Sequence, residues 1–544
     1  MRKKNLWMLA LAMVLSLASC SEKDNPVAEN PTVEDLAEAT VIWYGTGGGN
    51  VDAAIMNNFR QFYRAQPGSY DRVNIVAQYK VSAKPTIYYG MTQEEVVQEA
   101  ESMAAERTEE EMEEAGPLEY FWLCHPKEGA TYRFVLDAKK TLRQQLQETE
   151  PYGELNCDFT CPDSLTNFIN WAAAHYPAKK YILVMADHGG GYLPHKDLPE
   201  QQPVTQTRGL IFDDGYSKKC FSAKSFARAV RNAKVRPEGI VLYLCLMNNM
   251  EFLYEAKDVT DYIAASTYSL TGKGGALQSI VDNMAAGFDT ETALGNFVDD
   301  TMDSIDDIFY DPAEPDAPYY YDMTLTKTSR LNDFAPLLRE FTDRLVDVYQ
   351  NGTDRQRRTI DICTSLAVKV QNTYPFYDMA KFMKTLFVAM PDVFDDELNE
   401  RIKTAFNACI AKQRNTKYLT SHNYQVDYSV LLGHKGCYAT YSYTNENKDP
   451  VLESAKVYEP DGTRYQYKYK GEGYDNIGIT ENYELANVKT WSSTFADTYQ
   501  QTTFDRLLGW SRWLLINETP PPAWSACSLK FQLPEGDVSD IPII

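Results

Sequence analysis

The chain has 544 residues, of which 44% are hydrophobic and 12% are aromatic, and its formal net charge is −23. This composition is typical of a globular protein with two or three hydrophobic cores, and it excludes a largely disordered chain. The negative charge argues against nucleic-acid binding and against electrostatic attraction to an anionic bilayer.

The first residues have the pattern of an export signal. Basic residues at 2–4 precede an apolar stretch over 6–17 that is too short to span a bilayer. Leu-Ala-Ser then precedes Cys20, which resembles the lipobox of bacterial lipoproteins, whose cysteine becomes the lipidated first residue. We expect a signal peptide over 1–19, a lipid on Cys20, a polar tether over 20–37 and an outer-membrane location in the cell envelope. An ordinary signal peptide with an incidental cysteine is the alternative.

Strand and helix patterns then alternate along the chain. Short apolar or β-branched runs predict strands over 40–44, 73–79, 132–136, 181–186, 210–212, 239–244 and 262–266. Helical periodicity is found over 51–63, 137–148, 162–176, the segment after Ser222, and 250–258. Strands that alternate with helices predict an α/β domain, with a mostly parallel sheet covered on both faces.

The pattern changes near residue 315. Residues 331–412 are helical in pattern, and 423–470 alternate tyrosine and other β-formers with polar residues, as antiparallel strands do. We therefore divide the mature chain into a domain over 38–314 and a mixed α+β region over 315–544 that packs on it.

Two of the buried strands end in groups suited to covalent catalysis. The strand over 181–186 runs into Asp187, His188 and Gly189, and the strand over 239–244 runs into Cys245. The carboxyl edge of a parallel sheet is where α/β proteins place their chemistry. A cysteine peptidase needs a thiol, an imidazole and backbone donors for the oxyanion, which the amides of Gly189 and Cys245 would supply. Either side chain alone is more simply explained as a capping histidine or a core cysteine.

The other cysteines and histidines do not form a metal-binding pattern. Nine cysteines follow Cys20, and an odd number leaves at least one thiol unpaired in an oxidising compartment. Cys157 and Cys161 are spaced for a disulfide or for half of a metal site, and zinc is disfavoured because no matching pair lies nearby. His188 and His195 do not have helical H-E-x-x-H spacing.

The order strand-Asp-His-Gly, then strand-x-Cys-Leu-Met-x-x-x-Glu, resembles the clostripain family of caspase-like cysteine peptidases, over roughly 38–290. The resemblance implies a caspase-like three-layer α/β/α domain that cleaves peptide bonds. It assigns His188 as the catalytic base or acid, Cys245 as the nucleophile and Gly189 to the oxyanion hole. It makes the exposed part of 193–220 a candidate self-cleavage segment. We expect no cofactor, and the calcium dependence of some members of that family is the alternative.

Two positions differ from the family pattern. Members that cut after Arg or Lys carry Asp two residues before the nucleophile, where this chain has Tyr243. An acidic residue is also common in a downstream glycine-rich loop, where this chain has Lys273. Burial of a substrate guanidinium without a carboxylate partner is costly. Tyr243 and Lys273 are therefore candidate substrate-binding residues. We do not expect strict specificity for Arg or Lys at P1, the residue before the cleaved bond, and Lys273 would favour an acidic or neutral P1 residue.

The sequence thus predicts a lipid-anchored cysteine endopeptidase with a Cys245/His188 dyad. Its partners would be a peptide or protein substrate and the membrane that holds the Cys20 lipid, with no nucleic acid. A non-catalytic envelope protein that uses a peptidase-like fold for binding is the main alternative. A carbohydrate-binding lipoprotein is a third hypothesis, based only on the aromatic-rich end of the chain.

Overall fold

The computed structural model describes residues 36–47, 51–80, 129–154, 157–192, 209–213, 219–272, 274–366, 370, 376–422, 425–431, 454–458, 464–469, 477–481, 499–514 and 516. The predicted signal peptide, most of the predicted tether, Cys20, Lys273 and most of the candidate self-cleavage segment lie outside the described residues. No helix within the described ranges is long and apolar enough to cross a membrane.

An eight-stranded sheet forms the centre of the molecule, in the order β11-β9-β8-β7-β4-β1-β2-β3. The five strands β2, β1, β4, β7 and β8 are parallel, while β3 and β9 pair antiparallel with the ends of this group. The predicted mostly parallel sheet is therefore confirmed. The strands are β1 (Ala37–Thr46), β2 (Val73–Lys80), β3 (Thr131–Val135), β4 (Ala178–Ala186), β7 (Gly239–Tyr243), β8 (Tyr262–Ala265), β9 (Asp322–Lys327) and β11 (Ile410–Asn415).

The central strands are apolar on both faces because each face covers a separate core. Along β4, Leu183 and Met185 belong to one hydrophobic cluster, while Ile182 and Val184 belong to the other. This alternation follows from the period of two in a strand. A continuous apolar run is therefore what a sheet in the middle of three layers requires.

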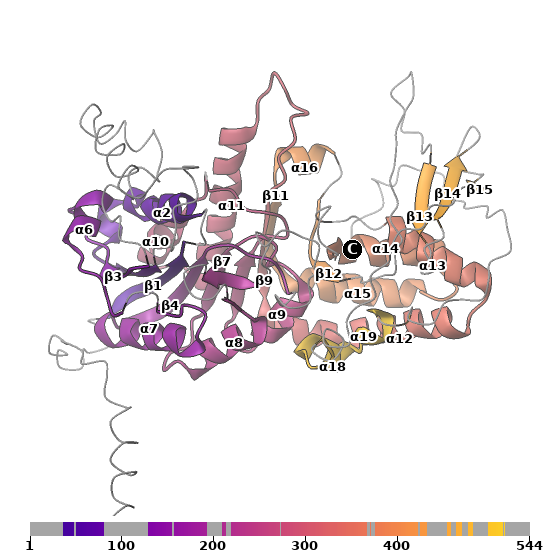
Figure 1. The fold of residues 1–544 in the computed structure, drawn as a ribbon, viewed down its shortest axis with the longest axis horizontal. Helices are drawn as coiled ribbons and strands as arrows, with labels where there is room; N and C mark the ends of the chain where they lie inside the picture. Colours follow the sequence, from indigo (N-terminus) through magenta and orange to yellow (C-terminus); the bar gives the residue numbers. More distant parts are fainter. Residues whose placement is uncertain are drawn as a thin grey trace, which may run out of the picture.

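Helices cover both faces of the sheet (Figure 1). One layer contains α2 (Asp52–Arg60), α6 (Leu142–Glu148), α10 (Leu277–Ala285) and α11 (Thr290–Phe309). The opposite layer contains α7 (Pro162–His175), α8 (Ala223–Asn232) and α9 (Met250–Ala256). The predicted three-layer α/β/α arrangement is confirmed.

Side-chain caps explain where two helices begin. Ser222 accepts a hydrogen bond from the backbone N–H of Ser225 at 3.1 Å, which confirms the predicted start of α8. The predicted helix over 137–148 begins later, at Leu142. Thr141 and Gln144 form a capping box there, with hydrogen bonds of 3.2 and 3.0 Å.

The short predicted strand near residue 210 lies outside the main sheet. It forms β5 (Leu210–Asp213), which pairs antiparallel with β6 (Lys219–Phe221). An isolated bridge joins Gly189 to Leu210, and the Gly190 N–H donates to the Gly209 carbonyl at 2.9 Å. This ribbon is thus attached directly to the loop that follows His188.

The region beyond residue 315 contributes to the main sheet and also forms a helical lobe. Strands β9 and β11 extend the sheet, so position 315 does not bound it. The predicted helical pattern over 331–412 is confirmed by four helices. Apart from β9 and β11, the described α-helices and strands of this region are these four helices, several short helices, two strands that pair with each other and a three-stranded antiparallel sheet. They are α12 (Leu331–Asn351), α13 (Asp354–Leu366), β10 (Phe376–Asp378), α14 (Met379–Ala389), α15 (Asp396–Cys409), α16 (Lys417–Ser421), β12 (Ser429–Leu431), β13 (Ser454–Tyr458), β14 (Arg464–Tyr469), β15 (Ile477–Glu481), α18 (Thr503–Leu508) and α19 (Ser511–Leu514).

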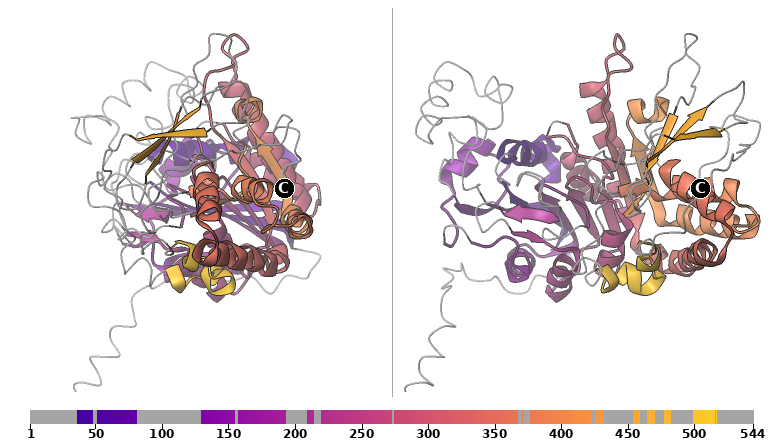
Figure 2. Two further views of the ribbon diagram at one scale, coloured as in Figure 1. Left: turned by 90° about the vertical axis from the view of Figure 1, so that its right-hand side faces the viewer. Right: turned by 45° about the vertical axis from the view of Figure 1, so that its right-hand side comes forward.

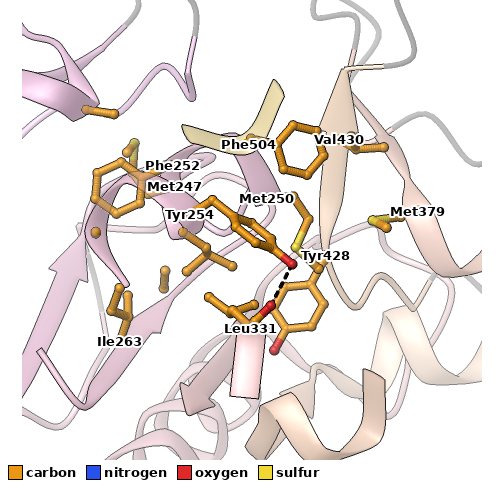
Figure 3. Close-up of a cluster of buried hydrophobic side chains, with 14 of the residues drawn as sticks. Met247, Met250, Phe252, Tyr254, Ile263, Leu331, Met379, Tyr428, Val430 and Phe504 are labelled. Atoms are coloured by element: carbon orange, nitrogen blue, oxygen red, sulfur yellow. Dashed lines mark hydrogen bonds between the residues drawn. The ribbon is translucent and has the colours of Figure 1, made fainter. Parts of the chain in front are cut away.

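This helical lobe lies at the β11 end of the sheet (Figures 1 and 2). Figure 3 shows how it joins the rest of the molecule: Tyr254 of α9 lies among Leu331, Tyr428 and Phe504, and all four are fully buried. The Tyr254 hydroxyl donates to the Leu331 carbonyl at 2.9 Å. The helix that follows Cys245 is therefore part of the core shared with the lobe.

Candidate active site

His188 and Cys245 follow two neighbouring parallel strands. In the β4–β7 pair, Ala186 lies opposite Tyr243. His188 and Cys245 each come two residues after these paired positions, so both lie at the carboxyl edge of the sheet. Both residues are partly exposed, although the strands beneath them are buried. The structure therefore brings the imidazole and the thiol to one accessible edge, as the sequence predicts.

The backbone of Gly189 lies directly against the backbone of Cys245. A Cβ atom built on Gly189 would lie 2.0 Å from the Cys245 carbonyl oxygen and 2.7 Å from its nitrogen. No side chain fits in that space, and only glycine lets two backbones approach so closely. The two amides proposed as oxyanion donors thus belong to adjacent residues in space.

Polar groups of the loop after β8 surround the Cys245 sulfur. The Leu270 N–H donates to Sγ at 3.3 Å. Burial raises the pKa of the Cys245 thiol, and hydrogen bonds from the Leu270 backbone, the Ser269 side chain and the Gly189 backbone lower it in part. The thiol is therefore mainly protonated at neutral pH in this arrangement, and its attack on a substrate requires a base that removes the proton.

The segment from Leu246 to Asn249 is a tight connection between β7 and α9. Leu246 has a φ of 63°, an uncommon value for a branched residue, and its carbonyl accepts a hydrogen bond from Asn249 Nδ2 at 2.9 Å. Asn249 also caps α9, because its Oδ1 accepts from the Phe252 N–H at 2.9 Å. This turn presents Cys245 at the edge of the sheet.

Tyr243 lies beneath the glycine-rich loop that was expected to contact substrate. Its side chain is 3% exposed, and its hydroxyl is 3.4 Å from the carbonyl oxygens of both Thr271 and Gly274. Gly275 has a φ of 98°, and a Cβ atom there would lie 2.7 Å from the Tyr243 hydroxyl. Tyr243 thus fills the space under the described part of this loop, and Lys273 is outside the described residues.

A second tyrosine, Tyr321, was not predicted from the sequence. It immediately precedes β9, and its hydroxyl forms a hydrogen bond with the Thr271 side chain. Burial raises the pKa of both Tyr243 and Tyr321, and the nearby Cys245 raises each further. Both phenols are therefore neutral at physiological pH, so neither supplies a negative charge beside the thiol.

Cys157 and Cys161, whose spacing suits a disulfide or half of a metal site, are not joined by a disulfide. Cys157 and Cys161 are both free thiols, so the disulfide interpretation is wrong, and Cys157 Sγ lies 3.1 Å from Thr131 Oγ1. Within the described ranges, no group of three or more His, Cys, Asp or Glu residues is arranged to hold a metal ion.

The region beyond residue 315 also contacts the loops at the candidate site. Asn248 Nδ2 donates to the Asp427 carbonyl at 2.7 Å, and the Ser429 N–H donates to the Asn248 carbonyl at 3.1 Å. On the other side, a Cβ atom on Gly191 would lie 2.4 Å from the Phe376 ring. Strands β10 and β12 therefore support the loops that follow Cys245 and His188. No local sequence pattern indicates this support.

A pair of buried carboxyl groups lies behind this support. Asp378 caps α14 by accepting from the Lys381 N–H at 2.5 Å, and its Oδ2 accepts from the Asp427 N–H at 3.0 Å. Burial and then the Asp427 carboxylate raise the pKa of Asp378 to about 7. A folded-state pKa above the unfolded value near 4 stabilises the fold at low pH, and this contribution is lost as pH rises toward 7.

Replacing Asp378 by Asn is therefore expected to flatten the pH dependence of stability. The wild-type free energy of unfolding should fall by a few kcal/mol from this group between about pH 4 and pH 7. Asn keeps the cap but does not titrate. Urea denaturation at a series of pH values checks this. Asp395→Asn, at the N-cap of α15, is the matched control. Asp395 has a lowered pKa, so its replacement should not remove the decrease in the free energy of unfolding over this pH range. An unchanged slope in Asp378→Asn would contradict the assignment.

The fold and this edge of the sheet together define the class: an α/β protein with the architecture and reactive groups of a cysteine peptidase. The model of the clostripain family matches residues 134–509, which is more than half of the chain. The chain therefore belongs to the clostripain family.

Individual relatives are distant in sequence. Clostripain of Hathewaya histolytica is 27% identical over 154 residues, which cover 27% of this chain and only 28% of that relative. A secreted C11 cysteine protease of Bacteroides thetaiotaomicron is 17% identical, with a TM-score of 0.48 over 70% of this chain and 87% of that structure. An inactive zymogen C11 protease of Parabacteroides distasonis is 14% identical, with a TM-score of 0.46 over 88% of this chain and 99% of that structure.

Proposed function

We propose that this chain is a cysteine endopeptidase in which Cys245 is the nucleophile and His188 transfers protons. The main support for this proposal is the register of β4 with β7. It favours a common location for both side chains at the carboxyl edge of the sheet. The contact between Gly189 and the Cys245 backbone supports the oxyanion site. Membership of the clostripain family is in accord with this chemistry.

The proposed reaction has two halves. His188 removes the proton from the Cys245 thiol, and the thiolate attacks the substrate carbonyl to form a tetrahedral intermediate. The backbone N–H groups of Gly189 and Cys245 stabilise its oxyanion. The imidazolium then gives its proton to the leaving amine as the peptide bond breaks, which produces a thioester on Cys245. Water, deprotonated by His188, hydrolyses the thioester and regenerates the thiol.

We further propose that the mature chain is anchored to the outer membrane through a lipid on Cys20. The basic, apolar and Leu-Ala-Ser-Cys segments at the start of the sequence support this location. Fractionation of the cells that produce the protein tests the anchor, because a chain recovered wholly in the soluble envelope fraction would contradict it. The proposed partners are a peptide or protein substrate and the membrane.

The residues near the thiol favour an uncharged P1 side chain over Arg or Lys. Tyr243 fills the position where an aspartate would pair with a basic P1 residue, and its phenol stays neutral because burial raises its pKa. A substrate cation at this position would lose hydration without gaining a carboxylate partner. An acidic P1 residue is the alternative if Lys273 contacts the substrate.

Peptide pools that differ only at P1 test both the activity and this preference. The mature wild-type chain is expected to cleave pools with uncharged P1 residues, and Cys245→Ala to cleave none. Tyr243→Asp should raise the relative kcat/KM for P1 Arg on the order of tenfold or more, because it restores a partner for the cation. Tyr243→Phe is the control, since it keeps the ring and adds no charge.

The outcomes separate the two functional hypotheses. Absence of Cys245-dependent cleavage in every pool, after proteolytic activation has been attempted, would favour a non-catalytic binding protein. Strong wild-type preference for P1 Arg or Lys would contradict the assignment of Tyr243 but leave the dyad intact.

A further inference from the structure

Asp322 is a fully buried carboxylate that the proposed chemistry does not use. It is the first residue of β9, and its side chain is 0% exposed. Its Oδ1 accepts hydrogen bonds from Ser266 Oγ at 2.7 Å, the Thr267 N–H at 3.0 Å and the Tyr268 N–H at 2.9 Å. The Thr267 N–H is also 3.1 Å from Oδ2. One carboxylate therefore fixes three consecutive residues after β8.

Those three residues in turn hold the segment that carries Cys245. The Ser266 carbonyl accepts from the Asn248 N–H at 2.9 Å, and the Tyr268 carbonyl accepts from the Leu246 N–H at 3.0 Å. Thr267 Oγ1 accepts from Asn248 Nδ2 at 3.1 Å. Each of the three residues that bond to Asp322 therefore also bonds to Leu246 or Asn248, which follow Cys245 in the chain.

The same loop continues to the sulfur itself. Two residues after Tyr268, the Leu270 N–H donates to Cys245 Sγ at 3.3 Å, and the intervening Ser269 also stabilises the thiolate. From these connections we propose that Asp322 is a positioning residue for the nucleophile: it sets the loop 266–270, which orients Cys245 and its thiolate donors. This inference rests on the proposed function of Cys245.

A carboxylate is the side chain suited to this task. It offers two acceptor oxygens and no donor, and the groups that converge on it are two backbone N–H groups and the hydroxyls of Ser266 and Thr267. Asparagine has nearly the same shape and keeps one acceptor oxygen, but its amide group would put a donor in place of Oδ2, which lies 3.1 Å from the Thr267 N–H. The position is also rigid, because β9 is paired on both sides, with β8 and β11. Asp322 therefore acts from a fixed strand on a loop that has no regular structure of its own.

Asp322→Asn is the variant that tests the proposal, with kcat, KM and the pH profile of Cys245 alkylation by iodoacetamide as the measurements. We expect kcat to fall on the order of 100-fold with little change in KM, because displacement of a reacting group by about 1 Å has that effect. The alkylation profile of Cys245 should shift to higher pH, because the thiolate loses its Leu270 and Ser269 donors. A merely structural role would move neither quantity.

Asp505→Asn is the matched control. Asp505 is also a buried carboxylate that accepts bonds from a backbone N–H and a serine hydroxyl, here both from Ser511, between α18 and α19. It should lower the melting temperature without changing kcat or the alkylation profile. If Asp322→Asn does not fold, Ser266→Ala removes one hydrogen bond of the same set and should lower kcat on the order of tenfold.

The experiment separates this inference from the proposed function. If the wild-type chain cleaves no peptide, the proposed function fails, but the alkylation profile still reports whether Asp322 positions the thiol. If Asp322→Asn, or Ser266→Ala in its place, matches Asp505→Asn in both kcat and alkylation, the positioning role is overturned. A shifted alkylation profile together with a lower kcat supports it.

Discussion

Replacement of His188 by alanine is expected to lower kcat for peptide cleavage on the order of 10⁴-fold. The reason lies in the state of Cys245: the residue is partly exposed, but the protein around its sulfur desolvates the thiol and raises its pKa. Without the imidazole, the proposed reaction loses the base that removes the thiol proton and the acid that protonates the leaving amine. Single-turnover and steady-state cleavage of a peptide with an uncharged P1 residue measure the loss.

His175→Ala is the matched control for this prediction. His175 ends α7, and its Nδ1 lies 2.9 Å from the Trp171 carbonyl oxygen. It precedes β4 by three residues and so lies at the opposite edge of the sheet from His188. Its replacement should leave kcat close to the wild-type value. Equal activity losses in the two variants would contradict a specific role for His188.

The exchange of Gly189 for alanine is expected to reduce kcat about 10²- to 10³-fold, the effect of losing one oxyanion donor. The added methyl group would lie 2.0 Å from the Cys245 carbonyl oxygen, so one of the two backbones must move. Either movement would separate the two amides that are proposed to bind the oxyanion. Comparison of kcat with the melting temperature shows whether activity falls while the protein remains folded.

Gly295→Ala tests whether the effect is specific to this contact. Gly295 lies within α11, and the nearest atom to an added Cβ would be Lys412 Cβ at 3.9 Å, an ordinary contact distance. Alanine should stabilise the helix by about 1 kcal/mol and leave kcat unchanged. Wild-type activity in Gly189→Ala would show that this glycine is dispensable for the reaction.

The strand and helix patterns were sufficient to predict the three-layer fold. Residues 181–186 and 239–244 are apolar throughout, and this pattern arises because successive side chains enter the two cores on opposite faces of the sheet. The positions of His188 and Cys245 after these runs predicted their common edge. Their pairing depends only on the neighbouring order of two strands, which is the simplest arrangement of such a sheet.

The support for the site could not be predicted in the same way. Asp322 follows three tyrosines at the start of an ordinary β-forming segment, and nothing in those residues indicates a contact with a loop that is 54 to 56 positions away. The contact of Phe376 with Gly191 and the bond between Asn248 and Asp427 span still longer separations. Such contacts depend on the assembled sheet, whereas periodicity reports only which face of an element is buried.

The change in sequence pattern near residue 315 also predicted only part of the structure. It correctly indicated the helices over 331–412, but β9 and β11 lie beyond it and complete the sheet. An edge strand with alternating polar residues resembles the start of a new antiparallel unit. An edge strand of the main sheet and the first strand of a new antiparallel unit differ only in the strand with which they pair. That partner is remote in the sequence.

Covalent trapping would show whether Cys245 is a nucleophile that His188 activates. The mature chain would be treated with a peptidyl chloromethyl ketone that has an uncharged P1 residue, and the modified residues located by mass spectrometry. We expect one rapid adduct, on Cys245, that is slowed by competing peptide and is largely lost in His188→Ala. Adducts spread over Cys157, Cys161 and the other thiols at similar rates, with Cys245 no faster than the rest, would contradict it.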